Sequence, residues 1–177
     1  MNDNDKTIQS ITRIHGFEII GLISNQGGMS DVYEAYQLSI GRRVAVKKLK
    51  STFIDDENIK GRFEKEARLL GKLNHANIIQ LIDFSNEHLT LIMEYVEGRP
   101  LDEVMSEEGE LSIEESLRII SEVLAGLHYA HQHHIIHRDI KPGNIFMTYD
   151  GRVKISDFGI ASIIEGDEIS SQTEKGN

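Results

Sequence analysis

The strongest constraint on this chain of 177 residues is a polar run at positions 137–144, with the letters H-R-D-I-K-P-G-N. The tripeptide 157–159, D-F-G, follows it after a short strand-like run. Either fragment alone could be an ordinary turn, because Asp and Gly are common turn residues. Together they set a candidate base, Asp139, near groups that can bind a metal ion. Such groups suit phosphoryl transfer, whose catalysis consists mainly of positioning and charge neutralisation.

Both strings resemble those of the Hanks-type (eukaryotic-like) serine/threonine protein kinases, in particular the bacterial branch of that family. The resemblance implies that Asp139 orients or deprotonates the attacking hydroxyl and that Lys141 screens the γ-phosphate. It also implies that Asn144 and Asp157 hold Mg²⁺ through oxygen atoms, the ligands that this hard cation prefers. Lys141, two residues after Asp139, resembles the serine/threonine branch rather than the tyrosine kinases.

The first half of the chain contains the further groups that the resemblance requires. Residues 44–47, V-A-V-K, alternate like a strand and would place Lys47 on the α- and β-phosphates, although an edge-strand lysine would look the same. Apolar residues recur at helical spacing over positions 59–73. Glu66 lies beside that stripe and is the expected partner of Lys47. Glu64, about half a turn away, is the alternative.

Residues 25–32, N-Q-G-G-M-S-D-V, resemble the glycine-rich loop of the family, G-x-G-x-x-G-x-V, with only Gly27 in its usual place. Glycine permits positive φ and a close approach of backbone N–H groups to phosphate, and asparagine tolerates left-handed φ better than most residues. A hairpin turn is the alternative. The residues of this loop that we expect to bind the nucleotide are Asn25, Gly27, Gly28, Met29, Ser30 and Val32.

An apolar, β-prone run over residues 89–96 changes at 97–100 to a composition typical of a linker. By resemblance this is the hinge of a kinase, where backbone groups would bind the adenine base of ATP. A buried strand that ends at a turn is the alternative. The remaining residues that we expect to contact the nucleotide are Ala45, Met93, Glu94, Val96 and Phe146.

The longest helical pattern begins at residues 111–115, where Ser112 and Glu115 have the spacing of a capping box. Its apolar residues predict a wide buried face, formed by Leu117, Ile120, Val123, Leu124, Leu127 and Ala130. Histidines crowd its end, at positions 128, 131, 133, 134 and 137. A metal site is the alternative interpretation of this tract. We favour a structural role, because no cysteine accompanies the histidines and because they suit the negative end of a helix dipole.

Composition is that of an ordinary globular protein, with 39% hydrophobic and 27% charged residues. The chain has no cysteine, no apolar run of about 18 residues and no signal peptide, so we expect a cytoplasmic protein without a membrane span. The net charge of −10 argues against nonspecific binding to nucleic acid or anionic lipid and favours a basic partner or substrate. Assembly into a homodimer is a further hypothesis.

These features predict an α/β (α+β), two-lobed protein-kinase-like fold. We expect a flexible segment at 1–15, a complete N-lobe at 16–96 with a five-stranded antiparallel sheet and one principal helix, and an incomplete helical C-lobe at 97–161. The family's domain usually continues for about another hundred residues with an A-P-E motif. We therefore expect a truncated kinase domain, a fragment of a longer kinase or a truncated product, with a naturally short member of the family as the alternative. Residues 162–177 would be the start of a disordered activation segment.

The expected function is ATP- and Mg²⁺-dependent phosphorylation of serine or threonine in protein substrates. One alternative is a noncatalytic, pseudokinase-like ATP-binding or interaction module that lacks the substrate platform, and another is a small-molecule kinase of the aminoglycoside type. A further hypothesis concerns regulation: a phosphate on Ser170, Ser171 or Thr173 would dock on Arg138, because a phosphate makes charge-assisted bonds to guanidinium.

Overall fold

The structure is a computed structural model that describes residues 13–14, 16–25 and 28–158. Gly27, Gly159 and the hypothetical phosphorylation sites Ser170, Ser171 and Thr173 lie outside the described residues. The chain divides into two compact units. The first comprises Met1–Ala67 with Gln80–Tyr95, and the second comprises Arg68–Ile79 with Val96–Asn177.

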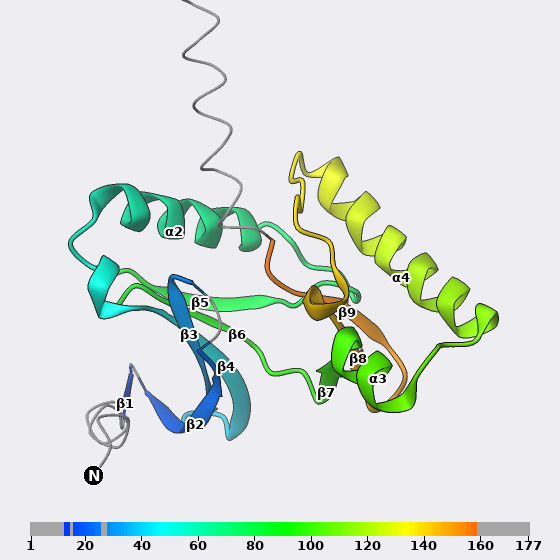
Figure 1. Cartoon of the computed structure of the whole chain (residues 1–177). Coiled ribbons are helices and arrows are strands. Elements are labelled where there is room, and N and C mark those ends of the chain that lie inside the picture. Colours follow the sequence, from blue (N-terminus) through cyan, green and yellow to red (C-terminus); the bar gives the residue numbers. More distant parts are fainter. Residues whose placement is uncertain (1–12, 15, 26–27, 159–177) are drawn as a thin grey trace, which may run out of the picture. The chain divides into compact units, whose positions relative to one another are not determined.

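The first unit is built on an antiparallel sheet of six strands in the order β1-β2-β3-β4-β6-β5 (Figure 1). We expected five strands, and the two-residue β1 adds a sixth at one edge. Alternating apolar residues of β2, β3, β4 and β6 form the core cluster Phe17, Tyr33, Ala35, Val44, Val46 and Ile92. The strands are β1 (Arg13–Ile14), β2 (Phe17–Ser24), β3 (Ser30–Gln37), β4 (Arg42–Leu49), β5 (Leu81–Ser85) and β6 (Thr90–Glu94).

Helix α2 (Glu57–Leu70) follows the short 3-10 helix η1 (Ser51–Phe53) and packs on the sheet. It begins after Asp56, whose Oδ1 accepts hydrogen bonds from two backbone N–H groups of the first turn, as an N-cap residue does. Phe63 is fully buried, with its ring 6.2 Å from that of Phe84 on β5. The helix ends at Leu70, and Leu73 remains buried in the turn that follows.

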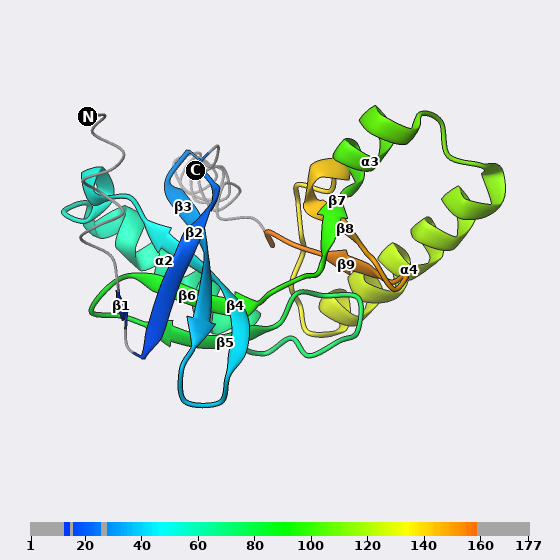
Figure 2. The same cartoon turned by 90° about the horizontal axis from the view of Figure 1, so that it is seen from below.

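The second unit contains a small antiparallel sheet, β7-β8-β9, beside the helices α3 and α4 (Figure 2). Its elements are β7 (Gly98–Pro100), α3 (Leu101–Glu108), α4 (Ile113–Gln132), the 3-10 helix η2 (Pro142–Asn144), β8 (Ile145–Thr148) and β9 (Val153–Ile155). Gly98 permits the close contact of β7 with β8, because a Cβ there would lie 2.2 Å from the carbonyl oxygen of Met147. Among the described residues, no helix combines the length and hydropathy needed to cross a membrane.

Helix α4 begins where the capping pattern predicts, since the Ser112 hydroxyl accepts from the N–H of Glu115 at 3.1 Å. The Glu115 carboxylate is bound by Arg118 rather than turned back to the cap. The predicted wide buried face is partly wrong. Ile119, Val123, Gly126 and Ala130 are buried, whereas Leu117, Ile120 and Leu124 are 65%, 55% and 58% exposed. Within the described part of the chain, α4 meets β9 at Gly126 and Glu122, and the three exposed side chains lie outside the part of the helix that is buried.

Candidate active site

The loop between α4 and β8 brings together three of the side chains that the sequence singled out. Asp139 Oδ2 accepts from Lys141 Nζ at 2.8 Å and from Asn144 Nδ2 at 3.0 Å. Asn144 Nδ2 also donates to the backbone oxygen of Asp139 at 2.8 Å. The turn η2 makes this possible, because it folds Asn144 back so that its N–H reaches the oxygen of Lys141 at 2.9 Å.

These contacts fix the charge state of the cluster. The hydrogen bond from Lys141, and then that from Asn144, hold the pKa of Asp139 below its usual value. The same bond to Asp139 raises the pKa of Lys141. Both side chains stay accessible, at 47% and 57% exposed. The loop therefore presents an ionised, solvent-accessible carboxylate that can accept a proton or orient a hydroxyl group.

His137 connects this loop to residues 156–158. Its ring is 1% exposed, with Nε2 2.7 Å from the backbone oxygen of Ser156 and Nδ1 3.3 Å from the N–H of Asp139. Burial lowers the pKa of His137, so the ring is neutral and donates from Nε2 while Nδ1 accepts. The ring of Phe158 packs against it at 4.6 Å between centroids.

Ser156 is a residue that the sequence did not single out. Besides accepting from His137, it donates its N–H to the backbone oxygen of Asn144 at 2.9 Å, so the two expected metal ligands, Asn144 and Asp157, come from adjoining backbone segments. Its hydroxyl adds longer contacts, to the backbone oxygen of Asn144 at 3.3 Å and to Asp157 Oδ2 at 3.5 Å. No sequence signal marks Ser156 except its place before Asp157, because its two shortest bonds use the main chain.

The donor set fits Mg²⁺. Asn144 is 7% exposed and uses its amide nitrogen for Asp139, which leaves Oδ1 as the atom suited to a cation. Asp157 supplies a carboxylate, and Mg²⁺ commonly takes one or two protein oxygens together with phosphate and water. The backbone is left-handed at Arg138 (φ 66°) and at Asp157 (φ 51°), and such conformations in residues other than glycine concentrate at functional sites.

The histidines at the end of α4 make local contacts. His128 Nε2 lies 3.0 Å from Gln132 Nε2, and His133 Nδ1 lies 2.9 Å from the backbone oxygen of Tyr129. Within residues 13–14, 16–25 and 28–158, there is no group of three or more His, Cys, Asp or Glu side chains that could hold a metal ion.

In the first unit, Lys47 on β4 pairs with Glu66 on α2. The distance from Lys47 Nζ to Glu66 Oε1 is 3.6 Å, and the two side chains are 9% and 3% exposed. Strand pairing sets Lys47 between Val32 of β3 and Leu91 of β6. Of the two glutamates that the sequence left open, Glu66 is the one that reaches the lysine.

The segment expected to cover phosphate joins β2 to β3. Ser30 is buried at the start of β3, and Gly28 is exposed with nothing within 4 Å of a Cβ built on it, so no steric contact requires glycine there. Lys50, which the sequence did not single out, holds both ends of the segment. Its N–H donates to Met29 O at 2.9 Å and its Nζ donates to Asn25 O at 3.3 Å.

The residues expected around adenine are distributed over both units. Met93 and Glu94 lie at the end of β6, where Met93 pairs with Ala45 of β4. The N–H of Glu94 is engaged by Gln80 O at 2.9 Å. Val96 belongs to the second unit, as does Phe146, which lies on β8 between Pro100 of β7 and Lys154 of β9.

Comparison with known proteins identifies the family. Residues 17–176 match the protein kinase domain. The chain is 42% identical over 146 residues to the serine/threonine-protein kinase PknA of Mycobacterium tuberculosis, a match that covers 78% of this chain and 34% of PknA. It is 37% identical over 161 residues to the serine/threonine-protein kinase PrkC of Bacillus subtilis, covering 89% of this chain and 25% of PrkC.

Solved structures agree. The crystal structure of the Mycobacterium tuberculosis PknI kinase domain superposes with a TM-score of 0.73 at 29% identity, covering 85% of this chain and 62% of that chain. The chain spans about a third of the length of PknA and a quarter of the length of PrkC. The predicted resemblance and the kinase-like fold are confirmed, and the chain belongs to the protein kinase family.

Proposed function

We propose that this chain binds Mg²⁺-ATP and contributes the catalytic groups that transfer the γ-phosphoryl group to serine or threonine of a protein substrate. The observation that carries the proposal is the cluster of Asp139, Lys141 and Asn144, joined through the backbone of Ser156 to Asp157. The relatives PknA and PrkC are named serine/threonine-protein kinases, which supports the acceptor class.

Each residue of the cluster has a role that its environment supports. Asp139 is ionised and accessible, so it can orient the acceptor hydroxyl and take its proton. Lys141 is cationic and can stabilise charge on the γ-phosphate. Asn144 and Asp157 would hold Mg²⁺, which when bound neutralises the phosphate oxygens. His137 keeps the loop and residues 156–158 together.

Residues of both units would contact the nucleotide. Lys47 is held by Glu66 at the sheet and would bind the α- and β-phosphates. Residues 25–32 would cover the phosphates, and Ala45, Met93, Glu94, Val96 and Phe146 would surround the adenine. The net charge of −10 favours a substrate with basic residues.

Thermal unfolding with millimolar Mg²⁺-ATP tests the proposal. A ligand that binds the native state raises the melting temperature, so we expect an upward shift in the wild type. Lys47→Ala should reduce the shift, and Asp157→Ala should remove the part of it that depends on Mg²⁺. Lys48→Ala is the matched control, because successive side chains of a strand point to opposite faces and Lys48 is not the lysine at Glu66.

Absence of any shift in the wild type would contradict the proposal. A shift without phosphoryl transfer to any tested protein would instead support the second candidate, a noncatalytic ATP-binding module. The observation in favour of that candidate is Asn25, which stands where the family usually has the first glycine of its loop.

A further inference from the structure

Strand β9 precedes Ser156 and Asp157 and pairs with β8 along one edge, and among the described residues its outer edge forms only an isolated β-bridge, between Ile155 and Ile78. Four backbone groups on that edge nevertheless have partners. The N–H of Val153 donates to Glu122 Oε2 at 2.9 Å, and its carbonyl accepts from Asn77 Nδ2 at 2.8 Å. The N–H of Ile155 donates to Asn77 O at 2.9 Å, and its carbonyl accepts from the N–H of Ile79 at 3.0 Å.

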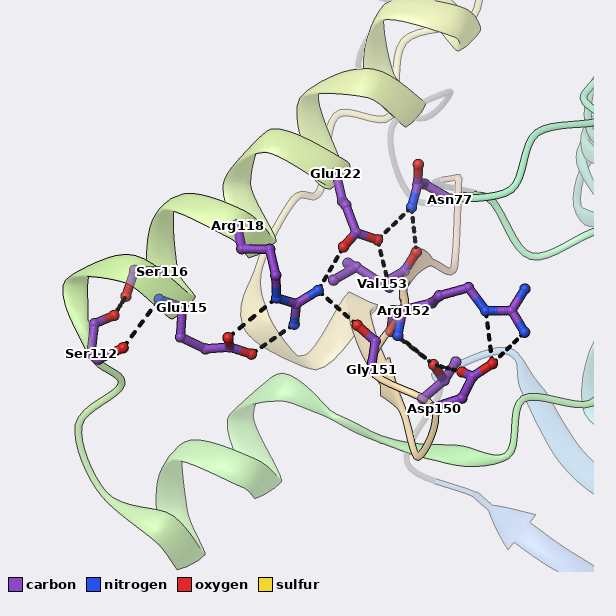
Figure 3. A network of polar contacts seen from close by, with 11 residues as sticks. Asn77, Ser112, Glu115, Ser116, Arg118, Glu122, Asp150, Gly151, Arg152 and Val153 are labelled. Atoms are coloured by element: carbon purple, nitrogen blue, oxygen red, sulfur yellow. Dashed lines mark hydrogen bonds and ion pairs between the residues drawn. The ribbon is translucent and has the colours of Figure 1, made fainter.

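Glu122 of α4 is the hub of this arrangement (Figure 3). Its Oε2 accepts from Val153 and also from Asn77 Nδ2, at 2.9 Å. Its Oε1 accepts from Arg118 Nη1 at 2.6 Å, and the same nitrogen donates to Gly151 O at 2.7 Å, in the turn between β8 and β9. One carboxylate therefore ties α4 to the residue that begins β9, to the segment after α2 and, through Arg118, to the hairpin turn.

The backbone edge of β9 that is hydrogen-bonded to Glu122 is buried. Val153 and Ile155 have no measurable exposure, and α4 approaches so closely that a Cβ on Gly126 would lie 2.9 Å from the Ile155 side chain. The Glu122 side chain itself is 27% exposed. Without it, the N–H of Val153 would either lack an acceptor, which costs more than an ordinary hydrogen bond is worth, or bind a water molecule that holds the strand less firmly than a side chain of α4 does.

We infer that Glu122 is a positioning residue: by fixing the outer edge of β9 it sets the backbone at Ser156 and Asp157 and thereby the Mg²⁺ affinity of the site. This inference rests on the proposed function for its metal. Residues that orient metal ligands without touching the ion typically change metal affinity by about 10- to 100-fold when removed. Glu122 contacts neither Asn144 nor Asp157, and its effect passes through Val153 and the two residues that follow it in β9.

The test compares the affinity of a nonhydrolysable ATP analogue in Mg²⁺ with its affinity in EDTA, by calorimetric titration of the full chain. In Glu122→Ala we expect the ratio of the two affinities to fall by about tenfold relative to the wild type. Glu122→Gln keeps one carbonyl oxygen for Val153 and Asn77 and should restore the ratio. Glu115→Ala is the matched control, because that carboxylate also binds Arg118 but has no contact with β9.

Hydrogen exchange of the amides of residues 153–158 gives a readout without metal or nucleotide. Faster exchange at Val153 and Ser156 in Glu122→Ala, with Glu115→Ala unchanged, supports the inference. If Glu122→Ala only lowers the melting temperature, with the affinity ratio and these exchange rates unaltered, the residue is merely structural and the inference fails. If the wild type shows no Mg²⁺ dependence, the proposed function fails and with it the metal part of the inference, while the exchange rates still decide whether Glu122 sets the backbone.

Discussion

The two units carry charged groups of opposite character. In the first unit Lys47 and Glu66 form a nearly dry pair, 9% and 3% exposed, supplied by a strand and a helix. In the second unit Asp139 and Lys141 are 47% and 57% exposed and lie on a loop, with Asn144 as a third member. Burying a single charge is costly, so Lys47 and Glu66 can be buried only as a pair, which requires the strand and the helix to pack together. The open cluster depends on local backbone geometry and retains access to solvent. From this comparison we expect substitutions in the buried pair to change mainly stability, and substitutions in the exposed cluster to change mainly the proposed chemistry.

The largest effect is expected in the open cluster and in chemistry alone. Asp139→Asn should lower phosphoryl transfer by about 10²- to 10⁴-fold, because it removes a proton acceptor or orienting group that acts mainly in the transition state. Affinity for Mg²⁺-ATP should stay nearly constant. Transfer of labelled γ-phosphate to a generic basic protein measures the first quantity and calorimetry the second. Equal turnover in the mutant and the wild type would remove Asp139 from the mechanism.

For the pair Lys47 and Glu66 we expect the opposite result, a large change in the free energy of unfolding. Lys47→Met leaves Glu66 buried without its cation and should lower the free energy of unfolding by about 3–5 kcal/mol. The double variant Lys47→Met, Glu66→Leu removes both charges and should recover much of that loss, since apolar replacement of a whole buried pair is often neutral. Urea denaturation measures all three proteins. A double variant no more stable than the single one would show that the pair itself, rather than the orphaned charge, holds α2 on the sheet.

The loop that carries the exposed cluster is bonded to the buried ring of His137, so the stability of the chain should depend on pH. Burial lowers the pKa of His137 below its ordinary value near 6.5, so the unfolded chain takes up a proton first. Stability from this group is complete above about pH 6.5 and declines as the pH falls toward the folded pKa, by at most about 1.4 kcal/mol per pH unit. Denaturation between pH 8 and 5, with an NMR titration of the His137 ring, measures the effect. A His137 ring that titrates at its ordinary pKa would contradict the prediction.

The smallest effect is expected from the exposed pair. Lys141→Ala should leave the free energy of unfolding nearly unchanged, because solvent-exposed ion pairs contribute little. The difference from the wild type should shrink further in 1 M NaCl, where screening acts over about 3 Å. A loss as large as that of Lys47→Met would erase the distinction between the two units.

The sequence predicted groups whose positions follow from local rules. The capping residue of α4 and the strand that carries Lys47 each depend on a few neighbouring residues. It did not predict Ser156, because its shortest bonds use backbone atoms that any residue would provide. It did not predict Lys50 either, because the partner of its Nζ is the backbone oxygen of Asn25, which lies far away in the sequence. Glu122 was also missed, since a glutamate on a helix is usually solvated and only the tertiary approach of β9 makes it a hub.

The exposed apolar residues of α4 show a second limit of prediction from sequence. Leu117, Ile120 and Leu124 share the helical periodicity of Val123 and Ala130, so hydrophobic pattern alone assigned all of them to one buried face. Periodicity gives the direction of a side chain but not whether another element covers it. Within the described residues, Val123 and Ala130 are buried, whereas Leu117, Ile120 and Leu124 remain exposed.

Arg138 and Asp157 adopt a left-handed backbone that glycine would adopt more easily. Residues with a side chain bear a conformational cost there, of about 1–3 kcal/mol. Glycine at either position should therefore make the chain harder to unfold, and at Asp157 it would also delete a carboxylate of the proposed metal site. A selection experiment for thermal resistance alone would be expected to enrich these glycines. If Asp157 holds Mg²⁺ as proposed, a selection for activity would restore the carboxylate at that position, where stability and function would then make opposite demands on the residue.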